Sequence, residues 1–484
     1  MRLGVAARFW LTGIVLAGAG CRTAAPAEPS MPVVGPAAPT ASGVDDEAVR
    51  GLPGYRSEMV TAPVFGGQVF VMEVGDARAP AVVLVHGLGE SGMRDWYPVL
   101  PALAEHHRVL AFDLPGFGRS THANELYSPA RYAEFIHALA GQRLQEPYNL
   151  VGHSMGGALS LVVAARFPGD VKRLILIDAA GMLHRKSYVN FAVSAGLDNL
   201  LGVLSGAAKE LATVAEESAA MAVGPIFPGS PDPSVVLRSE FLRGTVLGSP
   251  TRIAALAVIL EDFAPAIHGV LSPTWILWGS NDAIASPRSG LVLQARLPSA
   301  QLRVLEGSGH DPMASRPRAV EQFLLEALAA PAEVRGPRVV TPFPALPARK
   351  ARCERENGMR FSGDYAEIEI VGCKGAVVKD VRASAIKIRD SYVVVENTRV
   401  VGPGVALAVK GSKVEITASD FAGSVAVDVE GSDLDLAGVE LRGQRASIHV
   451  GGSSKLIFSV SRAESPINHR YLHGDYEFDI GVEL

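Results

Sequence analysis

Residues 152–156 read Gly-His-Ser-Met-Gly, and they are the most informative stretch of this 484-residue sequence. The apolar run Tyr148–Val151 precedes them, and the helix-compatible run Ala158–Ala165 follows. A G-x-S-x-G sequence between a strand and a helix makes a sharp turn in which the glycines leave room for the backbone. The start of the new helix supplies backbone donors and a field that favours an anion. The pattern predicts a strand, a turn and a helix that together present the hydroxyl of Ser154.

Apolar runs alternate with helical patterns from Ser57 to about Ala330. Most of the runs are continuously apolar, as expected of strands that are buried on both faces of a parallel sheet. Segments such as Pro129–Leu144 and Met155–Phe167 suit the intervening helices. The alternation predicts a doubly wound α/β domain over residues 51–330. The runs that we expect to be strands are Val69–Val74, Ala81–Val85, Arg108–Phe112, Tyr148–Val151, Lys172–Ile177, Thr274–Trp278 and Gln301–Leu305.

One long stretch, between Asp178 and Thr274, contains no clear strand pattern. Leucines recur there at helical spacing, among them Leu197, Leu201 and Leu204. We expect an all-helical insertion at about residues 181–265, lying over the carboxyl ends of the strands as a lid. A role for these leucines in the core is compatible with this, since a lid must also bury one face.

Further motifs occur in the same region, each after an expected strand. His86-Gly87-Leu88-Gly89 follows the second expected strand, and residues 113–120 read Asp-Leu-Pro-Gly-Phe-Gly-Arg-Ser. Asp282 follows the run ending at Gly279, and His310 follows the last expected strand. With these motifs the region 57–330 resembles the serine hydrolases of the α/β-hydrolase fold, esterases and lipases included. The resemblance implies a mostly parallel sheet of eight strands and the chain order Ser, acid, His.

The resemblance also implies roles for individual residues. Ser154 is the expected nucleophile, His310 the base that removes its proton, and Asp282 the acid that orients the imidazole. The backbone amides of Leu88 and Met155 are the expected oxyanion donors. Two neighbouring histidines, His86 and His153, are expected to be structural, as is the glycine-rich turn after Asp113. Asp178, which also follows a strand, is the rival position for the acid.

The expected reaction is hydrolysis of a carboxylic ester through an acyl-serine intermediate, on a small-molecule ester or acyl substrate. No metal or organic cofactor is implied. A rival reaction on the same fold is hydrolysis of a carbon–carbon bond in a diketone. A rival of another class is a cell-surface binding protein with a vestigial hydrolase domain, against which the intact Ser154, Asp282 and His310 weigh. A net charge of −5 gives no reason to expect nucleic acid as a partner.

The N-terminus has the features of an export signal. Arg2 and Arg8 precede a charge-free run, Phe9–Gly20, which is too short to span a bilayer as a helix. Small residues then lead into Cys21, so that residues 1–20 resemble a bacterial lipoprotein signal. The resemblance implies lipidation of Cys21 and an anchor in the cell envelope, in the outer membrane because Arg22 follows. A plain secretory signal is the alternative. Residues 21–50 are rich in Pro and Ala and suit an extended tether.

A second proline-rich linker, residues 331–352, separates the α/β region from a repetitive one, residues 353–484. There Asp390-Ser391, Lys410-Gly411-Ser412, Glu430-Gly431-Ser432 and Gly451-Gly452-Ser453 recur, with their serines 20 or 21 residues apart. Short alternating strands with Gly/Ser corners at this period predict an all-β solenoid, and the pattern resembles the right-handed parallel β-helix. A two-sheet sandwich would also show short alternating strands.

No Ser, His and acid recur in the repeats in a triad-like order. We therefore expect a non-catalytic module for spacing, stability or the binding of a cell-envelope partner or glycan. If Cys21 is lipidated, Cys353 and Cys373 remain as a pair that could form a disulfide in an oxidising compartment, with two free thiols as the alternative. The positions expected to point inward are Val405, Leu407, Val409, Val425, Val427 and Val429.

Overall fold

The computed structural model describes residues 46–194, 234–297, 299–331, 346–479 and 481–483, all within one compact unit. The predicted signal peptide, Cys21, nearly all of the tether and most of the second linker lie outside these residues. The leucines that suggested the lid, from Leu197 to Leu211, also lie outside them. Among the described helices, none is long and apolar enough to cross a membrane.

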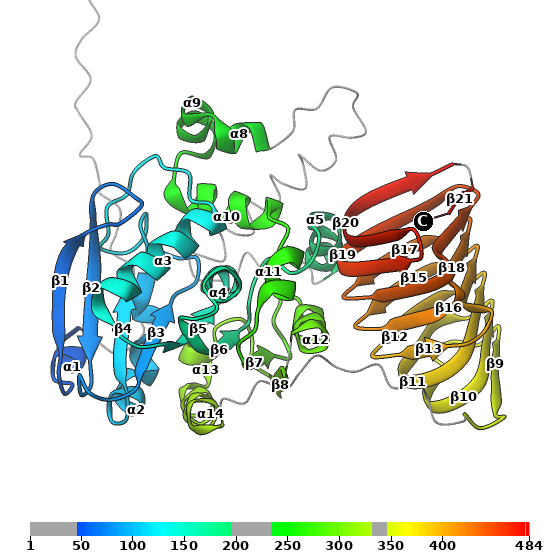
Figure 1. Ribbon diagram of the computed structural model, residues 1–484, viewed down its shortest axis with the longest axis horizontal. Helices are drawn as coiled ribbons and strands as arrows, with labels where there is room; N and C mark the ends of the chain where they lie inside the picture. Colours follow the sequence, from blue (N-terminus) through cyan, green and yellow to red (C-terminus); the bar gives the residue numbers. More distant parts are fainter. Residues whose placement is uncertain (1–45, 195–233, 298, 332–345, 480, 484) are drawn as a thin grey trace, which may run out of the picture. The chain divides into compact units, whose positions relative to one another are not determined.

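The N-terminal part of the unit is built on an eight-stranded sheet with the order β1-β2-β4-β3-β5-β6-β7-β8 (Figure 1). The pairings β1–β2 and β2–β4 are antiparallel, and all others are parallel. The strands are β1 (Arg56–Thr61), β2 (Gln68–Val74), β3 (Ala81–Val85), β4 (Arg108–Phe112), β5 (Tyr148–His153), β6 (Val171–Ile177), β7 (Thr274–Gly279) and β8 (Gln301–Leu305).

The predicted mostly parallel sheet is confirmed, and its seven expected strands match β2 to β8 within two residues at each end. The exposed strand β1 begins with three consecutive polar residues, Arg56, Ser57 and Glu58, and has no apolar run, so the pattern did not predict it. The edge strand β8 has no fully buried residue, so the expectation of burial on both faces is wrong there.

Helices cover both faces of this sheet, and strand periodicity shows why. Along β3, Val83 and Val85 pack into one core cluster, whereas Val82 and Leu84 pack into the other. Successive side chains of a strand point to opposite faces, so a continuously apolar strand supplies both cores. The helices outside the expected lid are α1 (Asp46–Arg50), η1 (Gly92–Val99), α2 (Leu100–Ala104), α3 (Pro129–Arg143), α4 (Met155–Arg166), α12 (Pro287–Arg296), α13 (Pro312–Ser315) and α14 (Pro317–Ala329).

In the described residues between β6 and β7 every regular element is a helix, as predicted. Serine side chains cap two of its helices, and the hydroxyl of Ser249 accepts a hydrogen bond from the amide of Arg252 at the start of α10. The described helices between β6 and β7 are α5 (Arg185–Ser194), α8 (Ser234–Arg238), α9 (Glu240–Leu242), η3 (Arg243–Leu247), α10 (Pro250–Leu260) and α11 (Ala264–Gly269).

The C-terminal part consists of strands that pair mainly in parallel, each with a strand about one repeat further on. Val393 pairs with Val414, Val414 with Leu434, and Leu434 with Leu456. The pairing path closes on itself because β12 pairs with both β11 and β15. This arrangement is consistent with the predicted solenoid. The strands are β9 (Lys350–Glu354), β10 (Arg360–Val371), β11 (Lys374–Arg389), β12 (Tyr392–Glu396), β13 (Arg399–Val401), β14 (Val405–Lys410), β15 (Lys413–Thr417), β16 (Asp420–Glu430), β17 (Asp433–Ala437), β18 (Glu440–Gly451), β19 (Ser454–Ser465), β20 (Asn468–Phe478) and β21 (Val482–Glu483).

The recurring serines stack in a hydrogen-bonded row that we call the serine ladder: Ser391, Ser412, Ser432 and Ser454. The amide of each of the first three donates to the hydroxyl oxygen of the next, over 3.0 to 3.2 Å. The fourth member is Ser454 and not Ser453, so the expected spacing is wrong at the last repeat. Its last step is 22 residues long because that corner holds one additional residue.

The predicted inward positions are correct except for one. Leu407, Val409, Val425, Val427 and Val429 are buried, whereas Val405 is 37% exposed. Ala406 and Leu407 are both fully buried, so the alternation is interrupted directly after the Gly402-Pro403-Gly404 corner. A disulfide joins Cys353 to Cys373, and both side chains are buried in the core of this part.

Helix α12 contacts the C-terminal strands through two arginines. The guanidinium of Arg288 donates to the carbonyl oxygen of Ile416 over 2.8 Å. Arg296 lies 3.0 Å from the carboxylate of Asp420 and 2.8 Å from that of Glu440. The side chains of Arg288 and Arg296 are only 10% and 6% exposed, and buried charges of this kind need their partners.

Candidate active site

Ser154 occupies the turn between β5 and α4 with a backbone conformation that few residues adopt. Its φ is 51° and its ψ is −119°. Close packing of the backbone explains the two flanking glycines. A Cβ atom on Gly152 would lie 2.3 Å from the carbonyl oxygen of Gly156, and one on Gly156 would lie 2.2 Å from that of Val85. The motif thus allows a strained turn that presents the serine at the carboxyl end of the central strand.

The structure brings Ser154, His310 and Asp282 together, although 128 residues separate the first from the third. The Nε2 atom of His310 lies 2.8 Å from the Oγ of Ser154. Its Nδ1 lies 2.8 Å from the Oδ2 of Asp282. With Nδ1–H donating to the carboxylate, Nε2 is free to accept the hydroxyl proton. This is the hydrogen-bonding order that a nucleophilic serine requires.

Two opposing effects act on the imidazole of His310. Burial, the largest single effect, lowers its pKa, but the negative charge and the hydrogen bond of Asp282, with smaller contributions from neighbouring carboxyl groups, together raise the pKa to about 9. The carboxylate itself is firmly held, because its Oδ1 accepts hydrogen bonds from the amides of Ile284 and Ala285 over 2.8 and 2.9 Å. Asp282 therefore lies where an acid can orient and stabilise the imidazolium.

Asp178, the rival position for the acid, makes no hydrogen bond to His310. It lies fully buried after β6, where its Oδ1 accepts a hydrogen bond from the amide of Gly279 over 2.8 Å. The imidazole is thus paired with Asp282 and not with Asp178.

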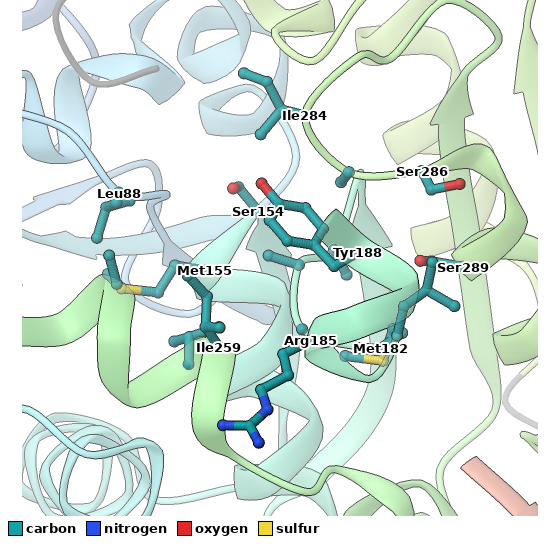
Figure 2. Close-up of a pocket in the computed structure, with 17 residues that line it drawn as sticks. Leu88, Ser154, Met155, Met182, Arg185, Tyr188, Ile259, Ile284, Ser286 and Ser289 are labelled. Atoms are coloured by element: carbon teal, nitrogen blue, oxygen red, sulfur yellow. The ribbon is translucent and has the colours of Figure 1, made fainter. Parts of the chain in front are cut away.

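The two expected oxyanion donors line the same cavity as Ser154. Met155 is the first residue of α4, and the first amides of a helix have no partner within the helix. Leu88 follows β3 in the loop His86–Gly89, and it lies beside the cavity together with Met155 (Figure 2). Both residues therefore lie beside Ser154 at the cavity, where the expected role would require them.

The neighbouring histidines have structural partners, as expected. Nδ1–H of His86 donates to the carbonyl oxygen of Gly87, and Nε2 accepts from the amide of Leu114. Burial lowers the pKa of His86. The Nε2 of His153 lies 2.8 Å from the carbonyl oxygen of His310 and braces the backbone of the loop that carries His310. Burial, the largest effect, lowers the pKa of His153 to about 4, and both rings remain neutral near neutral pH.

The cavity in front of Ser154 has a volume of about 50 Å³ and mostly apolar walls (Figure 2). The motifs in the sequence did not reveal these walls, because residues from separate helices and loops form them. The residues that motif analysis missed are Ala179, Ala180, Gly181, Met182, Leu183, Arg185, Tyr188, Ala255, Val258, Ile259, Ile284, Ala285, Ser286 and Ser289. Only the helical spacing between β6 and β7 hinted at them, through the predicted lid. In the described ranges no cluster of His, Cys, Asp and Glu could hold a metal ion.

Comparison with known proteins places this site in a family. Residues 80–317 match the family model described as the alpha/beta hydrolase fold. An uncharacterized protein of Mycobacterium tuberculosis is 30% identical over 262 residues, which cover 51% of this chain and 75% of that protein. Lipase 1 of Psychrobacter immobilis is 27% identical over 256 residues, 51% of this chain and 76% of the lipase.

A third relative is named for a different activity. The 2-hydroxy-6-oxo-2,4-heptadienoate hydrolase of Pseudomonas putida is 30% identical over 246 residues, 47% of this chain and 82% of that enzyme. The matched region contains the strand–turn–helix around Ser154 and the positions of Asp282 and His310. The chain belongs to the α/β-hydrolase fold family.

Proposed function

We propose that the protein is a serine hydrolase that cleaves a carboxylic ester. The observation that supports this most is the continuous hydrogen-bonded chain from Ser154 Oγ through His310 to the buried Asp282. The mostly apolar cavity beside it suits an acyl group, and lipases are among the relatives.

The geometry suggests how each step proceeds. As Ser154 Oγ attacks the ester carbonyl carbon, its proton passes to Nε2 of His310, and the amides of Leu88 and Met155 stabilise the oxyanion. The tetrahedral intermediate then expels the alcohol, which takes the proton from His310 and leaves an acyl-serine. Water attacks this ester in the same way, releasing the carboxylic acid and restoring the serine.

A fluorophosphonate probe tests the reaction class, because it labels only an activated serine. We expect labelling of the purified protein at Ser154, and none of the Ser154→Ala variant. Absence of labelling in the folded wild type would contradict a serine hydrolase and favour a vestigial domain. A series of p-nitrophenyl esters of increasing acyl length would then show the preferred substrate.

Hydrolysis of a carbon–carbon bond is the second candidate, because one relative at 30% identity is named for a substrate of that kind. Both reactions would use Ser154, His310 and Asp282, so labelling with the probe does not distinguish ester hydrolysis from hydrolysis of a carbon–carbon bond. Parallel assays with p-nitrophenyl esters and a vinylogous diketone do. We expect a higher kcat/KM for the esters, and the reverse would establish the second candidate.

For the N-terminus we propose export and a lipid anchor on Cys21 in the outer membrane of the cell envelope. Several acyl chains, at about 0.8 kcal/mol per buried methylene, give a stable anchor where a single chain does not. In a Gram-negative host the protein should partition with outer membranes, and Cys21→Ser should block lipidation and maturation. Mass spectrometry that finds an unmodified N-terminus beginning after Cys21 would refute this.

For the C-terminal part we propose a β-solenoid without catalytic residues, which stabilises the hydrolase and binds a cell-envelope partner or glycan. All three triad residues come from the N-terminal part. A protein truncated after residue 335 should therefore still be labelled at Ser154 and turn over small esters. It should also unfold at a lower temperature, because Arg288 and Arg296 lose their partners. A folded, truncated protein without any activity would show that the repeats complete the site.

A further inference from the structure

Asp178 is a buried carboxyl group for which the proposed reaction has no role. Its side chain is fully buried at the end of β6, and the residue adopts a φ of 45°. The amide of Gly279 donates to its Oδ1. Its Oδ2 is buried and has no hydrogen-bond partner among the atoms that the structure describes. An ionised oxygen in that situation would be costly, because a buried charge needs donors.

The hydrogen bonds of Asp282 show where the second oxygen of Asp178 can find a partner. The Oδ1 of Asp282 already accepts from two amides, whereas its Oδ2 accepts only from Nδ1 of His310. A carboxylate oxygen can accept a second hydrogen bond. One acceptor position on Asp282 is therefore open. Gly279 links the two aspartates, because its amide donates to Oδ1 of Asp178 and its carbonyl oxygen accepts from the amide of Asp282.

The electrostatics of the pair favour one charge rather than two. Burial, and next the negative charge of Asp282, raise the pKa of Asp178 well above its usual value, while the imidazolium of His310 opposes them. Two carboxylates in one buried site do not both ionise. The charge resides on Asp282, because that residue has two amides and an imidazole as donors, whereas Asp178 has one amide.

We propose that Asp178 is protonated in the active enzyme and that its Oδ2–H donates to Oδ2 of Asp282, so that it positions the catalytic acid. This inference rests on the proposed serine hydrolase function, in which Asp282 orients His310. Asp178 exchanges no proton with the substrate. It donates to the same carboxylate oxygen that accepts from His310 and takes up part of its negative charge.

An asparagine at position 178 mimics the protonated acid, because its carbonyl can accept from Gly279 and its amide group can donate to Asp282. Asparagine also tolerates a positive φ. In Asp178→Asn we expect kcat within about threefold of wild type and an unchanged apparent pKa of His310 in the pH dependence of kcat/KM. If Asp178 were ionised in the wild type, removal of its charge would lower that pKa by about one unit, and this result would overturn the proposal.

Asp178→Gly removes the donor and permits the positive φ. We expect kcat to fall by roughly ten- to a hundredfold with little change in KM, the size of effect that one hydrogen bond to a charged group can produce. The apparent pKa of His310 should rise, because Asp282 then carries its charge undivided. A wild-type kcat, or a lower thermal stability with an unchanged pKa, would show a merely structural role and overturn the proposal.

Infrared difference spectroscopy tests the proton directly and does not depend on turnover. The wild-type minus Asp178→Asn difference spectrum at neutral pH should show the carbonyl band of a buried neutral carboxyl group, and the subtraction removes the contribution of Asp95, whose pKa burial raises to about 7. Absence of that band from the difference spectrum would overturn the proposal even if the enzyme is active. Failure of the fluorophosphonate probe to label Ser154 would refute the proposed function instead, and the band would still report on the carboxyl pair.

Discussion

Buried serines occur in both parts of the molecule, and their hydroxyl partners differ. In the α/β part, Ser154 is 3% exposed, and its Oγ lies within hydrogen-bonding distance of an imidazole nitrogen. In the C-terminal part, Ser412 and Ser432 are 6% and 3% exposed, and their hydroxyls donate to the backbone carbonyls of Lys410 and Glu430. Burial of a serine therefore says little about chemistry. What matters is whether the group that accepts the hydrogen bond of the hydroxyl can also remove its proton.

The two kinds of partner explain two kinds of role. A backbone carbonyl accepts a hydrogen bond but is no base in water, so the ladder hydroxyls stay protonated and join neighbouring turns. The imidazole of His310 can take the proton in the transition state and return it to the leaving group. The backbone differs as well, because Ser154 has a φ of 51° on a turn, whereas Ser412 and Ser432 precede regular strands.

The largest expected effect comes from removing the hydroxyl of Ser154. Ser154→Ala should reduce kcat for an ester substrate by roughly 10⁴- to 10⁶-fold, because only binding and oxyanion stabilisation remain. Circular dichroism should show an unchanged fold. The matched variant Ser412→Ala removes an equally buried hydroxyl and should leave kcat unchanged. Loss of activity in Ser412→Ala while the protein remains folded would break the distinction between the two kinds of serine.

The next effect is on the pH dependence. The carboxylate of Asp282 raises the pKa of His310 to about 9 against the effect of burial, and the base must be neutral to accept the proton of Ser154. A raised pKa means that less neutral imidazole is present at neutral pH, so kcat/KM should rise with pH. Below pH 8 we expect an increase of about tenfold per pH unit. A profile that is already flat at pH 7 would show that the free enzyme has a base of ordinary pKa.

Much of the site could be predicted from the sequence because its chemistry depends on local patterns. The turn around Ser154 needs glycines at two positions, and the acid and base each follow a strand whose apolar run is easy to recognise. The order of these motifs favoured Asp282 over Asp178 as the acid. In the structure Asp282, and not Asp178, makes a hydrogen bond to His310.

Other features depend on tertiary contacts that leave no periodic signal. The cavity wall combines Met182 from the loop after β6, Tyr188 from α5, Ile259 from α10 and Ile284 from the loop after β7. The exposed strand β1 lacks an apolar run because solvent covers it, and it forms by pairing with β2. The proton shared between Asp178 and Asp282 depends on two loops that only the folded sheet brings together.

The smallest expected effect is on stability and concerns the serine ladder. The sequence pattern predicted Ser453 as its fourth member, whereas the structure has Ser454 in that place. The hydroxyl of Ser454 accepts from the amide of Ser432 over 3.2 Å and is buried, whereas Ser453 is exposed. Ser454→Ala leaves that amide buried without an acceptor, which should lower the free energy of unfolding by about 1–3 kcal/mol. The adjacent Ser453→Ala should change it by less than about 0.5 kcal/mol.

Urea denaturation of the two variants, followed by far-UV circular dichroism, compares these values at adjacent positions. Neither variant should alter kcat, because no ladder hydroxyl faces a base. A larger loss of stability in Ser453→Ala than in Ser454→Ala would restore the even spacing read from the sequence. It would also mean that the additional residue of the last repeat lies outside the corner before Ser454. Equal, small effects in both would show that a ladder hydrogen bond contributes no more than the water that replaces it.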